Sequence, residues 1–207
     1  MAASAQQQIA LQHVNVKLFL ADAAGLNLEP LIPVFHSWIT GSAFNEMLLD
    51  VADYRHVPSG PGVVVIGHEA DYAVDNAGGR LGVRYNRKAA VEGDNAFVLQ
   101  QAARAALTAY RRLEEEPRLG GKLRFNGREI EIFVNDRLLA PNRVETFEAV
   151  RTDLEAFARK LFRGAGDSLS YDSTRDPRSL FSVTLKSSRA FSAAELLQNL
   201  ASLPHTN

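Results

Sequence analysis

One pentapeptide, Pro-Ser-Gly-Pro-Gly at 58–62, constrains the fold of this chain more than any other segment. Proline fixes the backbone φ angle and glycine tolerates positive φ, so this composition favours a tight reversal of the chain. The flanking residues include many Val, Ile, Leu and Tyr, which are typical of strands. We therefore expect strands over 47–57 and 62–74 to pair antiparallel, because so short a connection cannot join parallel strands.

Further elements are predicted on both sides of this hairpin. The turn Asn-Ala-Gly-Gly at 76–79 leads to a third strand over 80–88, which completes a three-strand meander. Helices are predicted to begin at Asn27, at Asp94 or Asn95, at Val144 and at Ser192, from capping residues and 3.6-residue periodicity. Pro33 would bend the first helix or shift its start. The other predicted strands cover 13–21, 122–125, 129–134, 168–173 and 180–187, with Asn126-Gly127 as a hairpin turn.

This order of elements predicts an α+β fold, with a largely antiparallel sheet and helices packed on one side. We expect a flexible N-terminal lead over 1–12, a first half over 13–117 and a second half over 118–207, the two halves sharing one core. The segments 16–22 and 130–136 can be aligned. One hypothesis is therefore that the halves are related β-α-β-β(-β)-α units, and the alternative is a chance likeness.

Composition narrows the classes of function. The 207 residues are 46% apolar and 23% charged, as in ordinary globular proteins. The net charge is −1, which argues against a nucleic-acid partner, because phosphate binding requires a surplus of Lys and Arg. The absence of cysteine excludes disulfides and sulfur-ligated zinc, and it fits a reducing compartment. No signal peptide and no membrane-inserting segment is evident, so we expect a cytoplasmic protein.

The first hairpin also gathers ionisable side chains. If it pairs around Gly60, the even-numbered side chains share one face, and Ala52 lies opposite His68. Asp50 and Tyr54 then come within diagonal reach of the imidazole of His68. A carboxylate beside an imidazole fixes its tautomer and raises its pKa, as a general base requires. The candidate catalytic residues are therefore His68 as the base, Asp50 to orient it and Tyr54 as a proton donor.

The same face and the neighbouring strand supply candidate ligand-binding residues. His56 and Tyr72 would lie on the face of His68, and the third strand presents Arg84 and Lys88. These basic side chains could hold a phosphate or a carboxylate. The simpler alternative is that they form cross-strand ion pairs with the acidic hairpin. No metal-binding motif occurs, so we assign no metal site, and the cofactor is unknown.

No motif identifies a family or a reaction. We expect a non-catalytic binding or assembly module that uses the polar face of the meander at 47–88, with a protein partner or self-association through a sheet edge as its mode of action. A first alternative is a small enzyme or metal-binding protein with a site at His68, Asp50, Glu69 and Asp71. A second alternative is a sensor of a small anionic ligand, which Tyr54, Tyr72 and Arg84 would orient.

Overall fold

The computed structural model describes residues 9–23 and 25–201, and these residues form both strands and helices. The strands are β1 (Val14–Ala21), β2 (Leu48–Tyr54), β3 (Gly62–Gly67), β4 (Ala70–Asp75), β5 (Gly82–Arg87), β6 (Arg124–Val134), β7 (Ser168–Ser170) and β8 (Phe181–Lys186). The helices are α1 (Leu31–Thr40), α2 (Asn95–Glu114), α3 (Val144–Phe162) and α4 (Ala193–Ala201), with single 3-10 turns η1 (Ala77–Gly79) and η2 (Pro117–Leu119).

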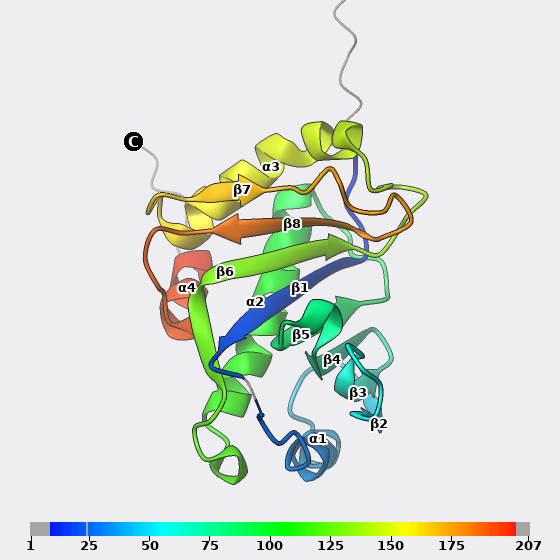
Figure 1. Ribbon diagram of the computed structural model, residues 1–207, viewed down its shortest axis with the longest axis vertical. Helices are drawn as coiled ribbons and strands as arrows, with labels where there is room; N and C mark the ends of the chain where they lie inside the picture. Colours follow the sequence, from blue (N-terminus) through cyan, green and yellow to red (C-terminus); the bar gives the residue numbers. More distant parts are fainter. Residues whose placement is uncertain (1–8, 24, 202–207) are drawn as a thin grey trace, which may run out of the picture.

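All eight described strands form one sheet in the order β2-β3-β4-β5-β1-β6-β8-β7, and every neighbouring pair is antiparallel. In Figure 1, α2 runs behind the central strands, α4 lies beside α2, and α1 and α3 lie near the two ends of the sheet. The predicted α+β class with an antiparallel sheet is therefore confirmed. We call the face of the sheet that α2 leaves uncovered the open face.

The central strand joins the two predicted halves. β1 pairs with β5 of the first half on one side and with β6 of the second half on the other. A single hydrophobic cluster draws residues from both halves, including Val16, Leu99, Ile132 and Leu154. The predicted relationship between the halves stays a hypothesis. Residues 1–8 of the predicted N-terminal lead lie outside the described residues, whereas Leu11 is buried and its N–H donates to Asn95 Oδ1 at 2.7 Å.

The predicted strand over 62–74 is two strands, so the meander has four strands rather than three. The chain turns at His68 and Glu69, between β3 and β4. Asp71 Oδ1 accepts a hydrogen bond from the N–H of Gly67 at 3.2 Å, which closes this turn. The turn could not be predicted from the sequence, because β3 and β4 both continue the apolar pattern of a single strand.

The predicted hairpin at Asn126-Gly127 is absent, because β6 continues through both residues. Gly127 has a φ angle of 71°, and the pairing of β6 with β1 shifts its register between Leu18 and Leu20. Asn126 Oδ1 accepts hydrogen bonds from the N–H groups of Arg128 and Glu129. The dipeptide thus makes a β-bulge rather than a turn, since the residues on both sides of it pair with the same strand.

The first helix begins at Leu31 rather than at Asn27. Asn27 Oδ1 instead accepts a hydrogen bond from the N–H of Glu29 at 2.9 Å, so this side chain stabilises a turn ahead of the helix. Pro33 then falls in the first turn of α1, where its missing N–H costs no intrahelical hydrogen bond. The shifted start is one of the two consequences predicted for Pro33.

None of the described helices combines the length and the apolar character needed to cross a bilayer.

Candidate functional site

The first hairpin forms, but its register differs from the predicted one. Ala52 lies opposite Val64, so the predicted pairing of Ala52 with His68 is wrong. The reversal is wider than the pentapeptide, with the N–H of Val57 donating to Tyr54 O at 2.9 Å and that of Gly60 donating to Val57 O at 3.0 Å. Because the alternation is kept through β2 and β3, Asp50 and Tyr54 still share the open face with Val64 and Ile66.

Both histidines of the hairpin lie in exposed turns. His68 belongs to the turn between β3 and β4, and its N–H donates to Met47 O at 2.8 Å. His56 belongs to the turn between β2 and β3. Asp50 lies opposite Ile66, so the sheet does not create the predicted pair of Asp50 and His68. Catalysis by His68 therefore stays a prediction without this geometry to support it.

The carboxylates of the hairpin are engaged by basic side chains. Lys88 Nζ lies 2.7 Å from Asp71 Oδ1, and Arg87 Nη1 lies 3.1 Å from Glu69 Oε2. These cross-strand ion pairs correspond to the simpler of the two interpretations of the basic strand. No group of three or more His, Asp or Glu side chains in the described part of the chain is placed to hold a metal ion.

The two candidate tyrosines lie on opposite faces of the sheet. The turn at His68 and Glu69 changes the alternation, so in β4 the odd-numbered Asp71 and Asp75 face the open side and Tyr72 faces the helices. Tyr72 is buried, and its hydroxyl donates to Glu46 Oε2 at 2.8 Å. Burial raises the pKa of Tyr72, and the nearby carboxylate of Glu46 raises it further. The predicted joint role of Tyr54 and Tyr72 on one face is therefore wrong.

The open face contains a hollow of about 370 Å³, which we call the open-face hollow. Its apolar side consists of aromatic and aliphatic side chains from β2 and β3. Its polar side consists of carboxylate, guanidinium and amide groups from β4 and β5. The lining residues are Tyr54, Pro61, Val64, Ile66, Asp71, Ala73, Asp75, Arg84 and Asn86. The structure thus brings together Tyr54 and Arg84, two of the residues selected from the sequence.

A row of five charged side chains runs from this hollow across β1 to the second half. Arg84 Nη1 lies 3.3 Å from Asp75 Oδ2, and Asp75 Oδ1 lies 2.5 Å from Lys17 Nζ. Lys17 is directly opposite Glu131 on β6, and Glu131 Oε1 lies 3.6 Å from Arg175 Nη1. We call these residues the charged row. Its signs alternate and it begins and ends with arginine, so three basic and two acidic groups leave it with a net charge of +1.

Lys17 and Asp75 form the buried centre of this row, and neither was among the residues selected from the sequence. Burial lowers the pKa of Lys17, while the carboxylates of Asp75 and Glu131 oppose that shift. A signal was present in the sequence, since Lys17 is the single charge within the apolar run at 14–21. A charge in the middle of a central strand needs a partner, and only the fold identifies Asp75 as that partner.

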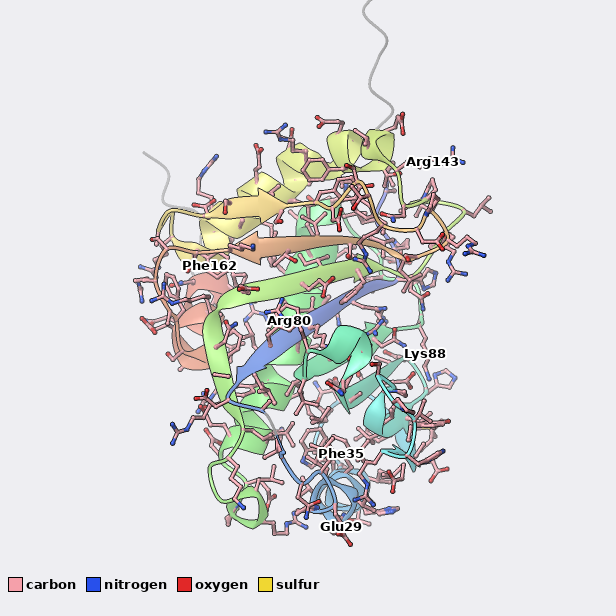
Figure 2. All side chains as sticks on the ribbon, in the orientation of Figure 1. Glu29, Phe35, Arg80, Lys88, Arg143 and Phe162 are labelled. Carbon is pink, nitrogen blue, oxygen red and sulfur yellow. The ribbon has the colours of Figure 1, made fainter. Side chains whose placement is uncertain are left out.

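Two arginines on the open face, Arg80 and Arg84, contact side chains of neighbouring strands. Figure 2 shows Arg80 in front of β1, where its guanidinium lies 3.6 Å from the ring centroid of Phe19 and 2.9 Å from Glu129 Oε2 on β6. Arg84 lies nearer the hollow, with its guanidinium 4.8 Å from the ring centroid of Phe133. Arg84 Nε is buried and has no acceptor among the described residues.

This arrangement has groups of the kind that hold an anion. A guanidinium with unused N–H donors binds a carboxylate or a phosphate through paired hydrogen bonds. The apolar side of the hollow is suited to a ring or a short alkyl chain.

Comparisons of the chain with protein-family models and with curated proteins found no match.

Proposed function

We propose that this protein is a non-catalytic binding module, and that its ligand is a small anion with an apolar body. The open-face hollow would bind the apolar body against Tyr54, Val64 and Ile66, and Arg84 would bind the anionic group. The observation that carries the proposal is that Arg84 lines this hollow while its buried Nε–H has no acceptor in the described structure. A buried donor without a partner destabilises the protein, and a ligand carboxylate would remove that penalty.

The charged row supports an anion over a cation, and Asp71, the other carboxylate of the hollow, is paired with Lys88. Asp75 is shared between Lys17 and Arg84, so neither of the two cations has a carboxylate to itself. Glu131 is likewise close to both Lys17 and Arg175. An added negative charge at Arg84 would bring the charged row to neutrality. An added positive charge would instead raise its net charge, at a greater electrostatic cost.

The test compares phenylacetate with phenylacetamide, which has the same ring but no charge. We expect phenylacetate to bind at least about tenfold more tightly, because hydrogen bonds to a charged group are the stronger kind. Calorimetry measures the two affinities, and the side-chain Nε–H resonance of Arg84 in an ¹H–¹⁵N NMR spectrum reports the site. Higher salt should weaken phenylacetate more than phenylacetamide.

Two variants locate the effect. Arg84→Met should abolish the preference for phenylacetate, whereas Arg178→Met removes an exposed arginine that pairs with Asp176 in a loop and should leave the preference intact. Equal affinities for the two probes in the unmodified protein would contradict the proposal. The same is true if Arg84→Met keeps the preference for the carboxylate.

We propose self-association as a second function, through the outer edge of β2. This strand ends the sheet, and no described strand pairs with its outer side. Met47, Leu49, Tyr54 and Val57 expose large apolar side chains on or next to it, with Met47 65% exposed. A second copy could add its own β2 antiparallel, because an unpaired edge is a template for a further strand.

Light scattering over a range of protein concentrations tests this assembly. We expect a dimer that Leu49→Lys shifts toward monomer, since a charge on the edge opposes strand addition. Leu138→Lys, at an exposed leucine far from β2, is the matched control and should leave the dimer unchanged. A monomer at every concentration would rule out this second function and leave the ligand proposal unaffected.

A further inference from the structure

A second cavity, of about 390 Å³, lies on the opposite side of the sheet from the open-face hollow. Its walls come from the segment between α1 and β2, which supplies Phe44 and Glu46, and from the first half of α2, which supplies Phe97 and Gln101. Tyr72 of β4 contributes from the helix-covered face. We call this space the aromatic cavity. It shares no lining residue with the open-face hollow.

Three side chains that line this cavity are aromatic, namely Phe44, Tyr72 and Phe97. The rings of Phe44 and Tyr72 stack at a centroid distance of 4.6 Å, and Trp38 packs edge-on against both. The rings of Phe44, Tyr72 and Trp38 therefore pack against one another. Phe97 differs, because its side chain is 53% exposed although it lines the cavity. An apolar ring in the cavity could therefore pack against Phe97 and remove it from water.

One polar atom of a lining residue of the cavity, Gln101 Oε1, is left unsatisfied within the described part of the chain. Tyr72 and Tyr85 donate their hydroxyl hydrogens to Glu46, at 2.8 and 3.2 Å. Gln101 Nε2 donates to the hydroxyl of Tyr85 at 3.0 Å. Gln101 Oε1 is buried and has no donor among the described residues. A complementary ligand therefore has to bring an N–H group to this oxygen.

The charges nearby argue against a cationic ligand. Arg87 Nη1 lies 3.6 Å from Glu46 Oε1, and the guanidinium of Arg112 lies 5.0 Å from the ring centroid of Phe44. Arg104 also lines the cavity. These basic groups offset the single carboxylate of Glu46, so a ligand cation would meet repulsion as well as attraction.

We propose that the aromatic cavity binds a neutral, planar heteroaromatic ring that carries an N–H donor. Phe97 and Gln101 are four residues apart on α2, so their side chains are neighbours on one face of the helix. One ring can then stack on Phe97 while its N–H donates to Gln101 Oε1. The protein would in this way recognise two ligand chemistries on opposite sides of its sheet.

Benzimidazole and 1-methylbenzimidazole are the probes, because the methyl group removes the N–H donor and keeps the ring. Trp38 is the single tryptophan of the chain and lies 5.1 Å from Phe44 between ring centroids, so its fluorescence reports binding in this cavity. We expect benzimidazole to bind about tenfold more tightly than its methylated analogue, since the methylated ring leaves Gln101 Oε1 without a donor. Equal affinities, or no change in Trp38 fluorescence with either probe, would overturn the proposal.

Three variants separate the contribution of the ring from that of the hydrogen bond. Gln101→Leu should abolish the preference between the probes, and Phe97→Ala should weaken both probes by a similar factor. Because Phe97 is half-exposed, its replacement should leave the fold intact, which circular dichroism checks. Arg84→Met should leave both affinities unchanged, because Arg84 lines the other hollow. A preference that survives in Gln101→Leu would contradict the assigned hydrogen bond.

Discussion

Lys17 Nζ lies 2.5 Å from Asp75 Oδ1, and the two side chains are only 1% and 3% exposed. The residues are 58 positions apart in the sequence, on β1 and β4, with β5 between their strands. Lys17 Nζ also donates to Ala77 O at 3.0 Å, so η1 lies against the same ammonium. This pair ties the end of β4 to the centre of the sheet.

Removing one member of this pair should be strongly destabilising. We expect Asp75→Leu to lower the free energy of unfolding by about 3–5 kcal/mol, because Lys17 is left buried without its closest carboxylate. The double variant Lys17→Met with Asp75→Leu should recover most of that loss, since it also removes Lys17, the more deeply buried of the two cations that contact Asp75. Urea denaturation of the two single variants and the double variant measures the coupling. Additive losses would show that the pair is not coupled.

Buried tyrosines should make the protein sensitive to alkali. Burial raises the pKa of Tyr85 to about 12, from an ordinary value of 10.0. The native state therefore keeps this proton between pH 10 and pH 12 while the unfolded chain loses it, so stability falls as the pH rises through that window. One such group contributes a slope of about 1.4 kcal/mol per pH unit. The pKa values of Tyr72 and Tyr110 are also raised, chiefly by burial, and act in the same direction.

Tyr85→Phe should reduce the loss of unfolding free energy per pH unit above pH 10 by the contribution of one tyrosine. Urea denaturation at several pH values measures this slope. The variant should also lose about 1 kcal/mol at neutral pH, because the hydrogen bonds to Glu46 and Gln101 disappear. Tyr54→Phe changes an exposed tyrosine and serves as the control for removal of a hydroxyl group. An unchanged slope in Tyr85→Phe would contradict the assignment.

The first residue of β3 should not tolerate a side chain. Gly62 has a φ angle of 66°, and a Cβ atom there would lie 2.0 Å from Val74 O. Gly78 has a φ angle of 72° but no atom within 4 Å of the same position. We expect Gly78→Ala to cost about 1–2 kcal/mol for the left-handed conformation alone, and Gly62→Ala to cost more because of the added overlap. Thermal unfolding compares the two, and equal losses would show that β3 and β4 separate easily.

Asn15 should be a site where an apolar residue stabilises the protein. Its side chain is fully buried on the open face, and neither amide atom has a partner among the described residues. Asn15→Val should raise the free energy of unfolding by about 1–3 kcal/mol, since unpaired buried polar groups carry a penalty of this size. The control is Asn86→Val, directly opposite, where the amide donates to Asp71 and no gain is expected. A loss of stability in Asn15→Val would indicate that this amide makes a further interaction.

The elements that the sequence predicts most accurately depend on neighbours within one or two turns. The helix predicted to begin at Val144 does begin there as α3, and Asp94 Oδ1 accepts from the N–H of Phe97 at 2.8 Å as a cap of α2. Ser192, where the last helix was predicted to begin, caps it by reciprocal hydrogen bonds of 2.8 and 3.2 Å with Glu195. Each of these features forms within a few residues of chain, so the local pattern contains the information needed.

The candidate site depended on strand register, and there the prediction was partly wrong. Tyr54 and Arg84 do meet at one hollow, because the alternation of β2 and β5 was predicted with the correct faces. Tyr72 was misplaced by an unrecognised turn at 68–69, which reversed the alternation in β4. The pairing predicted for His68 also failed because the register of the first hairpin puts Ala52 opposite Val64. A change of one residue in a turn moves every later side chain of a strand to the other face.

The order of residues alone determines the antiparallel α+β class, the helices α2, α3 and α4, and the reversal of the chain after β2. These depend on periodicity, capping and turn composition, which act over a few residues. Only the folded chain decides that β1 lies between β5 and β6, that Lys17 meets Asp75, and that Gln101 Oε1 is left without a donor among the described residues. Each of these results requires segments far apart in the sequence to pack together, and the contacts between them depend on the whole sheet.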